Sequence, residues 1–452
     1  MLRLHDTALG RGEELKTREP GRIGLYICGS TVYGPPHIGH GRFSLVYDVL
    51  RRFLEYSGLA VEHVSNVTDI DDKIIARSNE EGCRPEEIAE RYEAEWWDAM
   101  NTLGCLLPTQ VPHATSYIDQ MVELIAELVA LGSAYETSDG IYFTVSVVKD
   151  YGLLAHQSLA SLRSGARVEV NEEKRSPLDF ALWKKAKPAE PWWASPWGPG
   201  RPGWHTECVV MSLALLGEGF DLHGGGQDLI FPHHENERAQ AVATGKQFAR
   251  RWMHNGMVEA RGGEKMSKSL GNVLLLSELF ELSDPRAYRL LVLQSHYRAP
   301  IEVTATTLND AAAALGRLDA LSGRLAEAGR VDSGRADPGL KSAFAERMQD
   351  DLDTPGATAV LFDAIRRANV AFDSREVSRA AELARAALEC FGAVGLEAAG
   401  AIEIPESVLE LGRRRDQARA ERDFAAADVL RNEIVALGYV VEDTAGGTRI
   451  RR

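Results

Sequence analysis

The chain has 452 residues, of which 44% are hydrophobic and 26% are charged, as in a globular protein with two or three domains. Its formal net charge of −15 argues against a general nucleic-acid-binding protein but leaves room for a local basic surface. No apolar run approaches the roughly 20 residues of a membrane span, the first ten residues do not form a secretion signal, and the five scattered cysteines indicate a reduced, cytoplasmic chain.

The first part of the chain predicts an α/β sheet. Residues 23–28, IGLYIC, have the composition of a short buried strand, and a Gly/Pro-rich loop follows them. Apolar residues then recur at helical spacing over 42–58, with Gly58 suited to the C-terminal cap. A second strand is predicted over 59–67, and TDIDDKII at 68–75 has the pattern of a helix start. Strand, loop, helix and strand in this order are typical of a doubly wound, Rossmann-type parallel sheet.

The pattern changes between about 115 and 200. A helix is predicted over 120–132, and AYETSDGIYFTV at 134–145 indicates a hairpin that turns at Asp139–Gly140. A Trp/Pro-rich stretch over 183–204 follows, and we interpret this part of the chain as an insertion. The α/β pattern resumes with a helix over 206–217 and a strand over 220–223.

Beyond about residue 305 the chain is rich in Ala, Leu and Arg and is predicted to be helical, as at 311–329 and 375–392. The last stretch, 411–452, holds nine Arg against seven acidic residues and is locally basic. We therefore expect five regions: a catalytic domain in two halves (1–115 and 200–258), an insertion (116–199), a linking region (259–304), a helical bundle (305–404) and a small C-terminal domain (405–452).

Two short motifs indicate where a nucleotide binds. PHIGHGR at 36–42 lies between a predicted strand and a helix, where glycines and imidazoles can approach a polyphosphate and the helix N-terminus favours negative charge. EKMSKSLGN at 264–272 places two lysines and two serines on a glycine-flanked loop, which suits a mobile phosphate clamp. Either motif alone is compatible with an ordinary polar loop.

Together, in this order on an α/β pattern, the two motifs resemble those of the class I aminoacyl-tRNA synthetases. The resemblance implies that an amino acid is activated with ATP and Mg²⁺ and then transferred to the 3′-terminal ribose of a tRNA. It also implies that His37, Gly39 and His40 bind the ATP phosphates, and that Lys265 and Lys268 act in catalysis, with Lys268 stabilising the pyrophosphate leaving group.

FPHHENE at 231–237 allows three interpretations: a metal site, an acid–base pair or the polar first turn of a helix. If Pro232 opens a helix, His233 lies four residues and His234 three residues before Glu237, so the spacing does not choose between the histidines. Two cysteines favour the metal. Cys28 ends the first strand, at the sheet edge where ligands bind, and Cys208 lies near a helix start, where a thiolate is favoured. Spacing alone does not show that these groups meet.

Six stretches of the sequence resemble the cysteinyl-tRNA synthetases: CGSTVYGPPHIGH, NVTDIDDKI, KRSPLDFALWK, SPWGPGRPGWHTEC, DLHGGGQDLIFPHHENE and KMSKSLGN. The resemblance implies a cysteine–tRNA ligase that forms cysteinyl-adenylate and charges tRNA(Cys). It implies one Zn²⁺ per chain, held by Cys28, Cys208, His233 and Glu237. A thiolate is a far better zinc ligand than a hydroxyl, so this metal would separate cysteine from serine without an editing domain.

Other residues near these motifs have expected roles. Four are expected to line the cysteine pocket: Thr31, Thr68, Trp204 and His223. Thr68 also suits a helix N-cap, and Trp204 also suits simple packing. Four more lie where the ribose and adenine of ATP would sit: Gly224, Gly225, Gly226 and Asp228. Three carboxylates, Asp69, Asp71 and Asp72, are expected at a helix start, with magnesium ligation as the less favoured alternative. Cys83, Cys105 and Cys390 are expected to be structural.

The basic C-terminal segment resembles the anticodon-binding domain of the same family, although its charges alone also fit a charge-paired surface helix. The residues expected to contact the anticodon are Arg419, Phe424, Asp428 and Asp443. Two positions depart from the family pattern, because Phe424 and Ile450 stand where the family usually has Trp. Stacking is expected to be weaker at 424 and absent at 450.

Three rival interpretations share part of this evidence. The ligase that joins cysteine to an amino-sugar inositol in mycothiol synthesis resembles the same catalytic half, but it lacks the basic C-terminal module. A tRNA-binding paralogue without catalysis is disfavoured by the intact His37, His40 and Lys268, and a purely structural zinc protein would have no use for KMSKS. We expect a monomeric cytoplasmic enzyme whose substrates are L-cysteine, ATP and tRNA(Cys).

Overall fold

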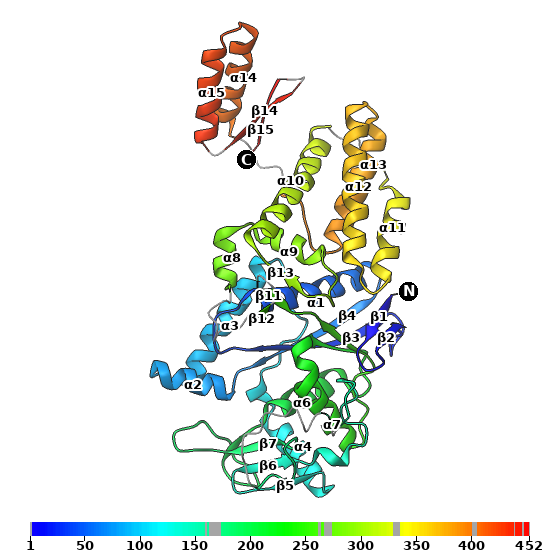
Figure 1. The fold of residues 1–452 in the computed structure, drawn as a ribbon, viewed down its shortest axis with the longest axis vertical. Helices are drawn as coiled ribbons and strands as arrows, with labels where there is room; N and C mark the ends of the chain where they lie inside the picture. Colours follow the sequence, from blue (N-terminus) through cyan, green and yellow to red (C-terminus); the bar gives the residue numbers. More distant parts are fainter. Residues whose placement is uncertain are drawn as a thin grey trace.

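The computed structural model describes most of the chain. The described residues are 2–158, 161, 173–260, 264–265, 274–328, 335–399, 405–437, 439–444 and 447–451. Figure 1 shows the catalytic sheet and its helices in the middle of an elongated molecule, with the insertion on one side of it and the helical regions on the other. Within the described part of the chain, no helix is long and apolar enough to cross a membrane.

A four-stranded parallel sheet forms the centre of the catalytic region, in the order β10-β9-β3-β4. Its strands are β3 (Arg22–Thr31), β4 (Ala60–Thr68), β9 (Leu222–Gly226) and β10 (Trp252–Asn255). Tyr26 of β3 pairs with Val64 on one side and His223 on the other, so β3 lies inside the sheet. The strands expected over 23–28 and 59–67 are confirmed, and so is the α/β fold class. The strand expected over 220–223 exists as β9, but it begins two residues later and continues through the glycines to Gly226.

Helices cover this sheet because each connection between parallel strands needs a crossover. They are α1 (Ile38–Tyr56), α2 (Asp72–Glu81), α3 (Pro85–Thr102), α6 (Trp204–Leu216) and α7 (Glu235–Ala243). The helix predicted over 42–58 is confirmed as α1, which begins four residues earlier within the HIGH motif, and Gly58 follows it with a positive φ of 90°. Two short helical turns, η3 (Gln227–Leu229) and η4 (Ile230–His234), connect β9 to α7.

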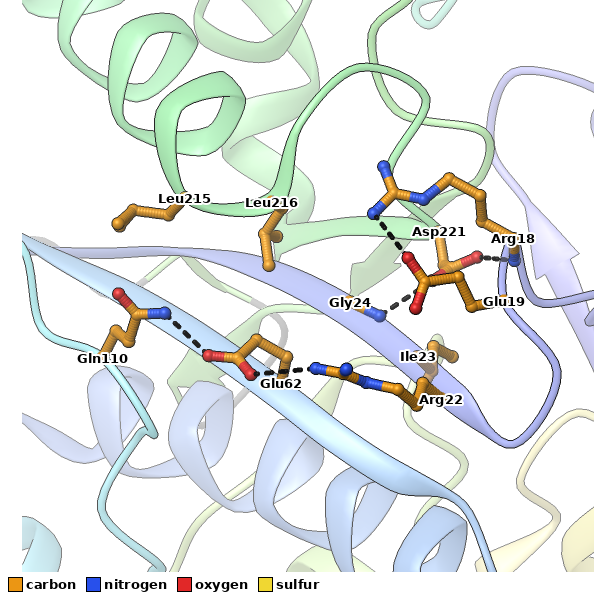
Figure 2. A pocket seen from close by; sticks show the side chains of 10 residues that line it. All are labelled: Arg18, Glu19, Arg22, Ile23, Gly24, Glu62, Gln110, Leu215, Leu216 and Asp221. Atoms are coloured by element: carbon orange, nitrogen blue, oxygen red, sulfur yellow. Dashed lines mark hydrogen bonds and ion pairs between the residues drawn. The ribbon is translucent and has the colours of Figure 1, made fainter.

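The amino-terminal edge of the sheet is closed by polar contacts around a small pocket of about 180 Å³ (Figure 2). Asp221, just before β9, accepts hydrogen bonds from the backbone N–H of Gly24 at 2.8 Å and from that of Arg18. On the neighbouring strand, the Glu62 carboxylate accepts a hydrogen bond from Gln110 at 2.7 Å. The Asp221 contacts hold the start of β9 against β3, and the Glu62 contact holds β4 against the segment around Gln110, all at the edge where the strands begin.

The insertion forms an antiparallel sheet in the order β5-β6-β7-β8. Its elements are η1 (Ala114–Tyr117), α4 (Ile118–Ala130), β5 (Ala134–Glu136), β6 (Gly140–Phe143), η2 (Val145–Val147), β7 (Phe180–Lys185) and β8 (Gly200–Pro202). The hairpin predicted to turn at Asp139–Gly140 is confirmed, since Glu136 pairs with Ile141 and the N–H of Thr137 donates to the Gly140 carbonyl.

The remaining elements are short strands at both ends of the catalytic region and the helices that follow it. The strands are β1 (Arg3–Asp6), β2 (Arg11–Glu14), β11 (Val258–Ala260), β12 (Glu264–Lys265) and β13 (Ile301–Glu302). The helices are α8 (Leu276–Leu282), α9 (Pro285–Leu293), α10 (Ala305–Glu327), α11 (Pro338–Gln349), α12 (Thr354–Asp373) and α13 (Val377–Gly392). The helices predicted over 311–329 and 375–392 are confirmed as α10 and α13.

A C-terminal module lies at the far end of the molecule from the insertion (Figure 1). It consists of α14 (Glu406–Ala420), α15 (Phe424–Ala436), β14 (Val440–Thr444) and β15 (Gly447–Arg451). It has a small apolar core of its own, formed by Val408, Leu411, Leu430, Ile434 and Val441.

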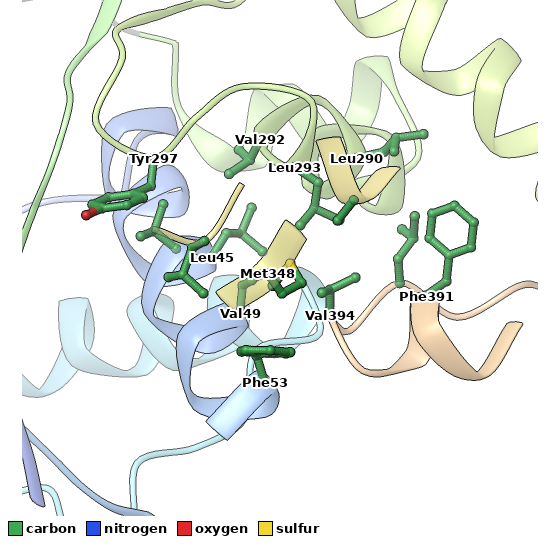
Figure 3. Packing of buried hydrophobic residues seen from close by; sticks show 14 of the residues in the cluster. Leu45, Val49, Phe53, Leu290, Val292, Leu293, Tyr297, Met348, Phe391 and Val394 are labelled. Atoms are coloured by element: carbon green, nitrogen blue, oxygen red, sulfur yellow. The ribbon is translucent and has the colours of Figure 1, made fainter. Parts of the chain in front are cut away.

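One apolar core joins the catalytic sheet to the helical regions. Figure 3 shows Leu45, Val49 and Phe53 on one face of α1, packed against residues of α9, α11 and α13. Within this core the Asp48 carboxylate of α1 accepts a hydrogen bond from the guanidinium of Arg289 on α9 at 2.5 Å, and both side chains are at most 2% exposed. Arg289 also donates to the carbonyls of Leu103 and Val394. A single buried cation therefore links α1, α3, α9 and the segment after α13.

We predict that Asp48→Asn lowers the free energy of unfolding by about 3–5 kcal/mol, because it leaves the buried Arg289 without its counter-charge. Chemical denaturation followed by circular dichroism measures this loss. Glu389→Gln is the matched control, since the Lys341–Glu389 pair is 35% and 45% exposed and is expected to contribute at most about 1 kcal/mol. Equal effects of the two substitutions would contradict the assigned role of the buried pair.

Candidate active site

The four predicted metal ligands lie together at the carboxyl edge of the parallel sheet. Cys28 comes from β3, Cys208 from α6, His233 from the turn η4 and Glu237 from α7. All four side chains are buried, and their ligand atoms lie within 4.8 Å of one another. The structure thus brings together two residues that are 180 positions apart in the sequence.

The distances between the ligand atoms suit a tetrahedral metal. The two sulfurs of Cys28 and Cys208 are 3.6 Å apart, and Cys28 Sγ lies 3.6 Å from Glu237 Oε1. His233 Nε2 lies 3.7 Å from Cys208 Sγ and 3.0 Å from Glu237 Oε1. Zinc bonds of about 2.0–2.3 Å give tetrahedral edges of roughly 3.3–3.8 Å. Three of these four distances fall in that range, and the His233–Glu237 distance of 3.0 Å is that of a hydrogen-bonded pair. Two thiols, an imidazole and a carboxylate form a donor set that fits zinc.

A second group of four overlaps the first, and it consists of Cys28, His223, His234 and Glu237. His223, expected in the cysteine pocket, lies with its Nε2 2.8 Å from Glu237 Oε2 and its Nδ1 2.9 Å from the Tyr26 carbonyl. His234 Nε2 lies 3.3 Å from Cys28 Sγ. The geometry therefore places His233 beside Cys208 and Glu237, and His234 beside Cys28. The group with both cysteines is the better zinc set, because zinc favours thiolates.

A bulge in β3 presents Cys28 to this cluster. The pairing of β3 with β4 shifts between Ile27 and Ser30, and Gly29 lies within the shift. A Cβ at Gly29 would lie 1.6 Å from the Asn66 carbonyl oxygen, so no other residue fits there. The Asn66 side chain in turn accepts the Gly29 N–H at 2.9 Å and fixes the bulge.

The charges in the cluster favour metal binding. Burial opposes ionisation of Cys208, but hydrogen bonding with Cys28 and the neighbouring His233 lower the Cys208 pKa to about 6. Burial likewise opposes protonation of His233, but the Glu237 carboxylate and Cys208 raise its pKa to about 10. Desolvation by burial raises the pKa of Cys28 well above its usual value. The lowered pKa favours the thiolate form of Cys208, and a cation that takes the place of the protons finds its ligands already assembled.

Two aromatic neighbours fix the orientation of His233. The ring of Trp204 stacks on it with centroids 4.0 Å apart, and Nδ1 of His205 lies 2.9 Å from His233 Nδ1. With Nε2 directed at the cluster, His233 Nδ1–H donates to His205, as the second nitrogen of a metal-ligating histidine commonly does. His205 was not among the predicted site residues, although it lies three residues before Cys208 on the same helix, which places both side chains on one face.

His254 and Asn66 were missed as well. His254 Nε2 lies 2.7 Å from His234 Nδ1, and Asn66 Oδ1 lies 3.7 Å from Cys208 Sγ. Asn66 lies near the end of β4, and His254 lies near the end of β10. Polar residues at the ends of predicted parallel strands are the sequence signal that could have found them.

Thr31 and Thr68 pair with each other across β3 and β4, at the same edge as the cluster. Thr68 is buried and donates to the carboxylate of the buried Glu207 at 2.8 Å. Thr68 is therefore not the N-cap of α2. Asp71 has that position and accepts the Lys73 N–H at 2.9 Å.

The other two predicted helix-start carboxylates differ from each other. Asp72 is the first residue of α2, whereas Asp69 accepts hydrogen bonds from the backbone and hydroxyl of Thr115. Asp72 also pairs with Lys184 and Arg201 of the insertion.

The HIGH motif forms the start of α1. His37 is its N-cap, and its ring stacks on that of His40 with centroids 3.7 Å apart. A Cβ at Gly39 would lie 3.0 Å from the His37 ring, so glycine permits this stack. The segment after KMSKS contacts the motif directly, because the N–H of Ile38 donates to the Leu274 carbonyl at 3.0 Å. Lys265 belongs to β12, where its backbone lies opposite that of Glu259 in the antiparallel strand β11. Lys268 lies outside the described residues.

The three glycines expected near ATP occupy β9 and its end. A Cβ at Gly224 would lie 2.5 Å from the Tyr47 ring, and one at Gly225 would lie 2.7 Å from the His234 ring. Close packing of the protein itself therefore already requires these two glycines. A Cβ at Gly226 would meet the carboxylate of Asp228, the fourth residue of this expected group.

The residues expected to read the anticodon lie on the C-terminal module. Phe424 begins α15 and is 64% exposed, and Asp428 is exposed one turn further along. Arg419 lies near the end of α14, and Asp443 belongs to β14. Ile450 is partly buried against the small core of the module.

Comparison with known proteins places these features in one family. The class I (C) tRNA synthetase catalytic domain matches residues 14–313, the DALR domain matches 343–395, and the cysteinyl-tRNA ligase anticodon-binding domain matches 402–451. The cysteine–tRNA ligase of Geobacter sulfurreducens is 44% identical over 99% of this chain and 98% of its own. That of Carboxydothermus hydrogenoformans is 43% identical over the full length of both chains.

Solved structures show the same fold at low sequence identity. Mycobacterium tuberculosis methionyl-tRNA synthetase in complex with methionyl-adenylate superposes with a TM-score of 0.64 at 17% identity, covering 90% of this chain and 96% of its own. The leucyl enzyme of Agrobacterium radiobacter K84, in a complex with tRNA, gives a TM-score of 0.61 at 12% identity over 86% and 88% of the two chains. The catalytic domain, the anticodon-binding domain and the full-length relatives agree, and the chain belongs to the cysteine–tRNA ligases, a family of class I aminoacyl-tRNA synthetases.

Proposed function

We propose that Cys28, Cys208, His233 and Glu237 hold one zinc ion and that this site selects L-cysteine for activation. The observation that carries the proposal is the buried four-ligand cluster, whose ligand atoms all lie within 4.8 Å of one another. When bound, zinc supplies a position that a substrate thiolate fills far better than a hydroxyl. Trp204 and His223 border the cluster, and with Thr31 and Thr68 they form the proposed cysteine pocket.

The ATP side of the reaction is assigned to the HIGH and KMSKS motifs. His37, Gly39 and His40 are proposed to contact the phosphates of Mg-ATP at the N-terminus of α1, where the helix dipole favours negative charge. Lys265 and Lys268 are proposed to stabilise the charge that develops on the pyrophosphate leaving group. Ribose and adenine are assigned to a group at the end of β9: Gly224, Gly225, Gly226 and Asp228.

The tRNA side is assigned to the C-terminal module. The anticodon of tRNA(Cys) is proposed to contact Arg419, Phe424, Asp428 and Asp443, with Phe424 as a stacking surface. The match of the family's anticodon-binding domain to residues 402–451 supports a tRNA acceptor, and the alternative acceptor, an amino-sugar inositol, is not supported. We also propose that the enzyme acts as a monomer in the cytoplasm, with the five regions given above as its units.

Cys208→Ser is expected to remove most of the bound zinc and to raise the KM for cysteine more than about 100-fold, while the KM for ATP changes little. Removing a residue that only hydrogen-bonds a metal ligand already lowers metal affinity about 10–100-fold, and Cys208 is proposed to be a ligand itself. Cysteine-dependent ATP–pyrophosphate exchange and elemental analysis measure the two effects. Cys83→Ser, at a cysteine away from the cluster, is the control. Equal increases in both KM values would mean that the metal has only a structural role.

Phe424→Ala is expected to raise the KM for tRNA about tenfold or more without changing pyrophosphate exchange. A stacked base contributes roughly 1–3 kcal/mol, and the activation step needs no tRNA. Charging with labelled cysteine measures this effect. Val377→Ala, which shortens an exposed apolar side chain on α13, is the control. An unchanged KM for tRNA would remove Phe424 from the anticodon contact.

A further inference from the structure

A cavity of about 870 Å³ lies between the insertion and the catalytic helices. One wall comes from the start of α2 and the start of α6, and the other comes from β6, β7 and β8 of the insertion. Trp204 and His205 belong to the wall, and both rings lie against the proposed metal ligand His233. The cavity therefore extends from the insertion to the cysteine site, and its volume is at the upper end for a small-molecule site.

Two cations of the insertion reach across this cavity to one carboxylate. Lys184 Nζ on β7 lies 2.5 Å from Asp72 Oδ2, and the guanidinium of Arg201 on β8 contacts the other oxygen of Asp72. The Asp72 side chain is 58% exposed and that of Arg201 only 7%. Arg201 Nε is buried and has no hydrogen-bond partner in the described part of the chain. Two positive groups in the wall thus share a single carboxylate that is exposed to solvent.

The other acidic groups of the wall are occupied by the protein itself. Asp71 accepts the Lys73 N–H, and Glu207 accepts the Thr68 hydroxyl. Asp179 accepts hydrogen bonds from the Tyr135 hydroxyl at 2.9 Å and from the Val145 N–H at 3.0 Å. These acids are held in place. A ligand that enters the cavity meets three cations of the described wall: Lys174, which donates to the Pro177 carbonyl at 3.4 Å, and Lys184 and Arg201, which share the exposed Asp72 carboxylate.

We propose that this cavity receives the unpaired 3′ end of the tRNA and that a backbone phosphate replaces Asp72 as the partner of Lys184 and Arg201. The proposal rests on the proposed function, because the terminal ribose must reach the activated cysteine beside His233. A phosphate satisfies a guanidinium and an ammonium at once through charge-assisted hydrogen bonds. Trp204, 36% exposed, offers an unpaired base a surface for stacking. Asp72 occupies the phosphate position and keeps the two cations in place.

The alternative is a simple structural contact between α2 and the insertion, and the two roles predict opposite signs for Asp72. If Asp72 competes with phosphate, Asp72→Asn lowers the KM for tRNA and Lys184→Ala raises it. If the three residues only fasten the insertion, both substitutions impair the enzyme in the same direction.

The experiment compares the full-length variants D72N, K184A and K185A in tRNA charging and in cysteine-dependent pyrophosphate exchange. We expect K184A to raise the KM for tRNA about tenfold, the loss of one charge-assisted hydrogen bond, and D72N to lower it several-fold. K185A is the matched control, because Lys185 follows Lys184 on β7, points to the other face of the strand and pairs with Glu136. R201K, which keeps the charge but loses the fork of donors, is expected to fall between wild type and K184A.

Equal increases of the KM for tRNA in D72N and K184A would overturn the proposal in favour of the structural contact. An effect of K185A as large as that of K184A would mean general attraction of RNA by the surface, and would overturn it as well. Failure of the proposed function looks different, since wild-type enzyme would then lack tRNA charging or cysteine-dependent exchange before any substitution is made.

Discussion

The active site depends on the parallel pairing of β3 with β9. Three residue pairs make this contact, from Leu25–Leu222 to Ile27–Gly224. They join two segments that are almost two hundred residues apart in the sequence, and they place Cys28 beside His223. Parallel strands end at one edge, so the HIGH turn after β3, the polar segment after β4 and the FPHHENE turn after β9 converge there. Cys28 lies near the end of a strand, Cys208 and Glu237 lie near the starts of helices, and His233 lies in the turn η4 between β9 and α7.

Much of this architecture could be predicted because its signals are local. Helix α1, strands β3 and β4 and the hairpin at Asp139–Gly140 follow from the spacing of apolar residues and from turn residues within about a dozen positions. The cysteines and FPHHENE could be recognised as ligand chemistry, but their meeting rests on contacts between distant segments. Spacing could not choose between His233 and His234, because both lie within one turn of Glu237 and the choice depends on what Cys208 and Cys28 face.

Other features needed the three-dimensional neighbours. Gly224 and Gly225 were expected to let ATP approach, yet the rings of Tyr47 and His234 already fill the space in which a Cβ would lie. Asp72 is at the helix start as expected, but its partners Lys184 and Arg201 are 112 and 129 positions away. A glycine in a sequence indicates that a side chain would clash at that position, and a carboxylate indicates a negative charge. Neither identifies the group that lies against it in the folded protein.

The C-terminal module has a separate core, which has an evolutionary consequence. Its five buried apolar residues contact one another, so substitutions within it can accumulate without disturbing the packing around Cys28 and Glu237. Ile450 is partly buried and packs against this core. The C-terminal module and the catalytic region can therefore diverge at different rates within one gene, because a substitution in the buried Cys/His/Glu cluster disturbs several neighbours at once and one on the exposed surface of the module does not.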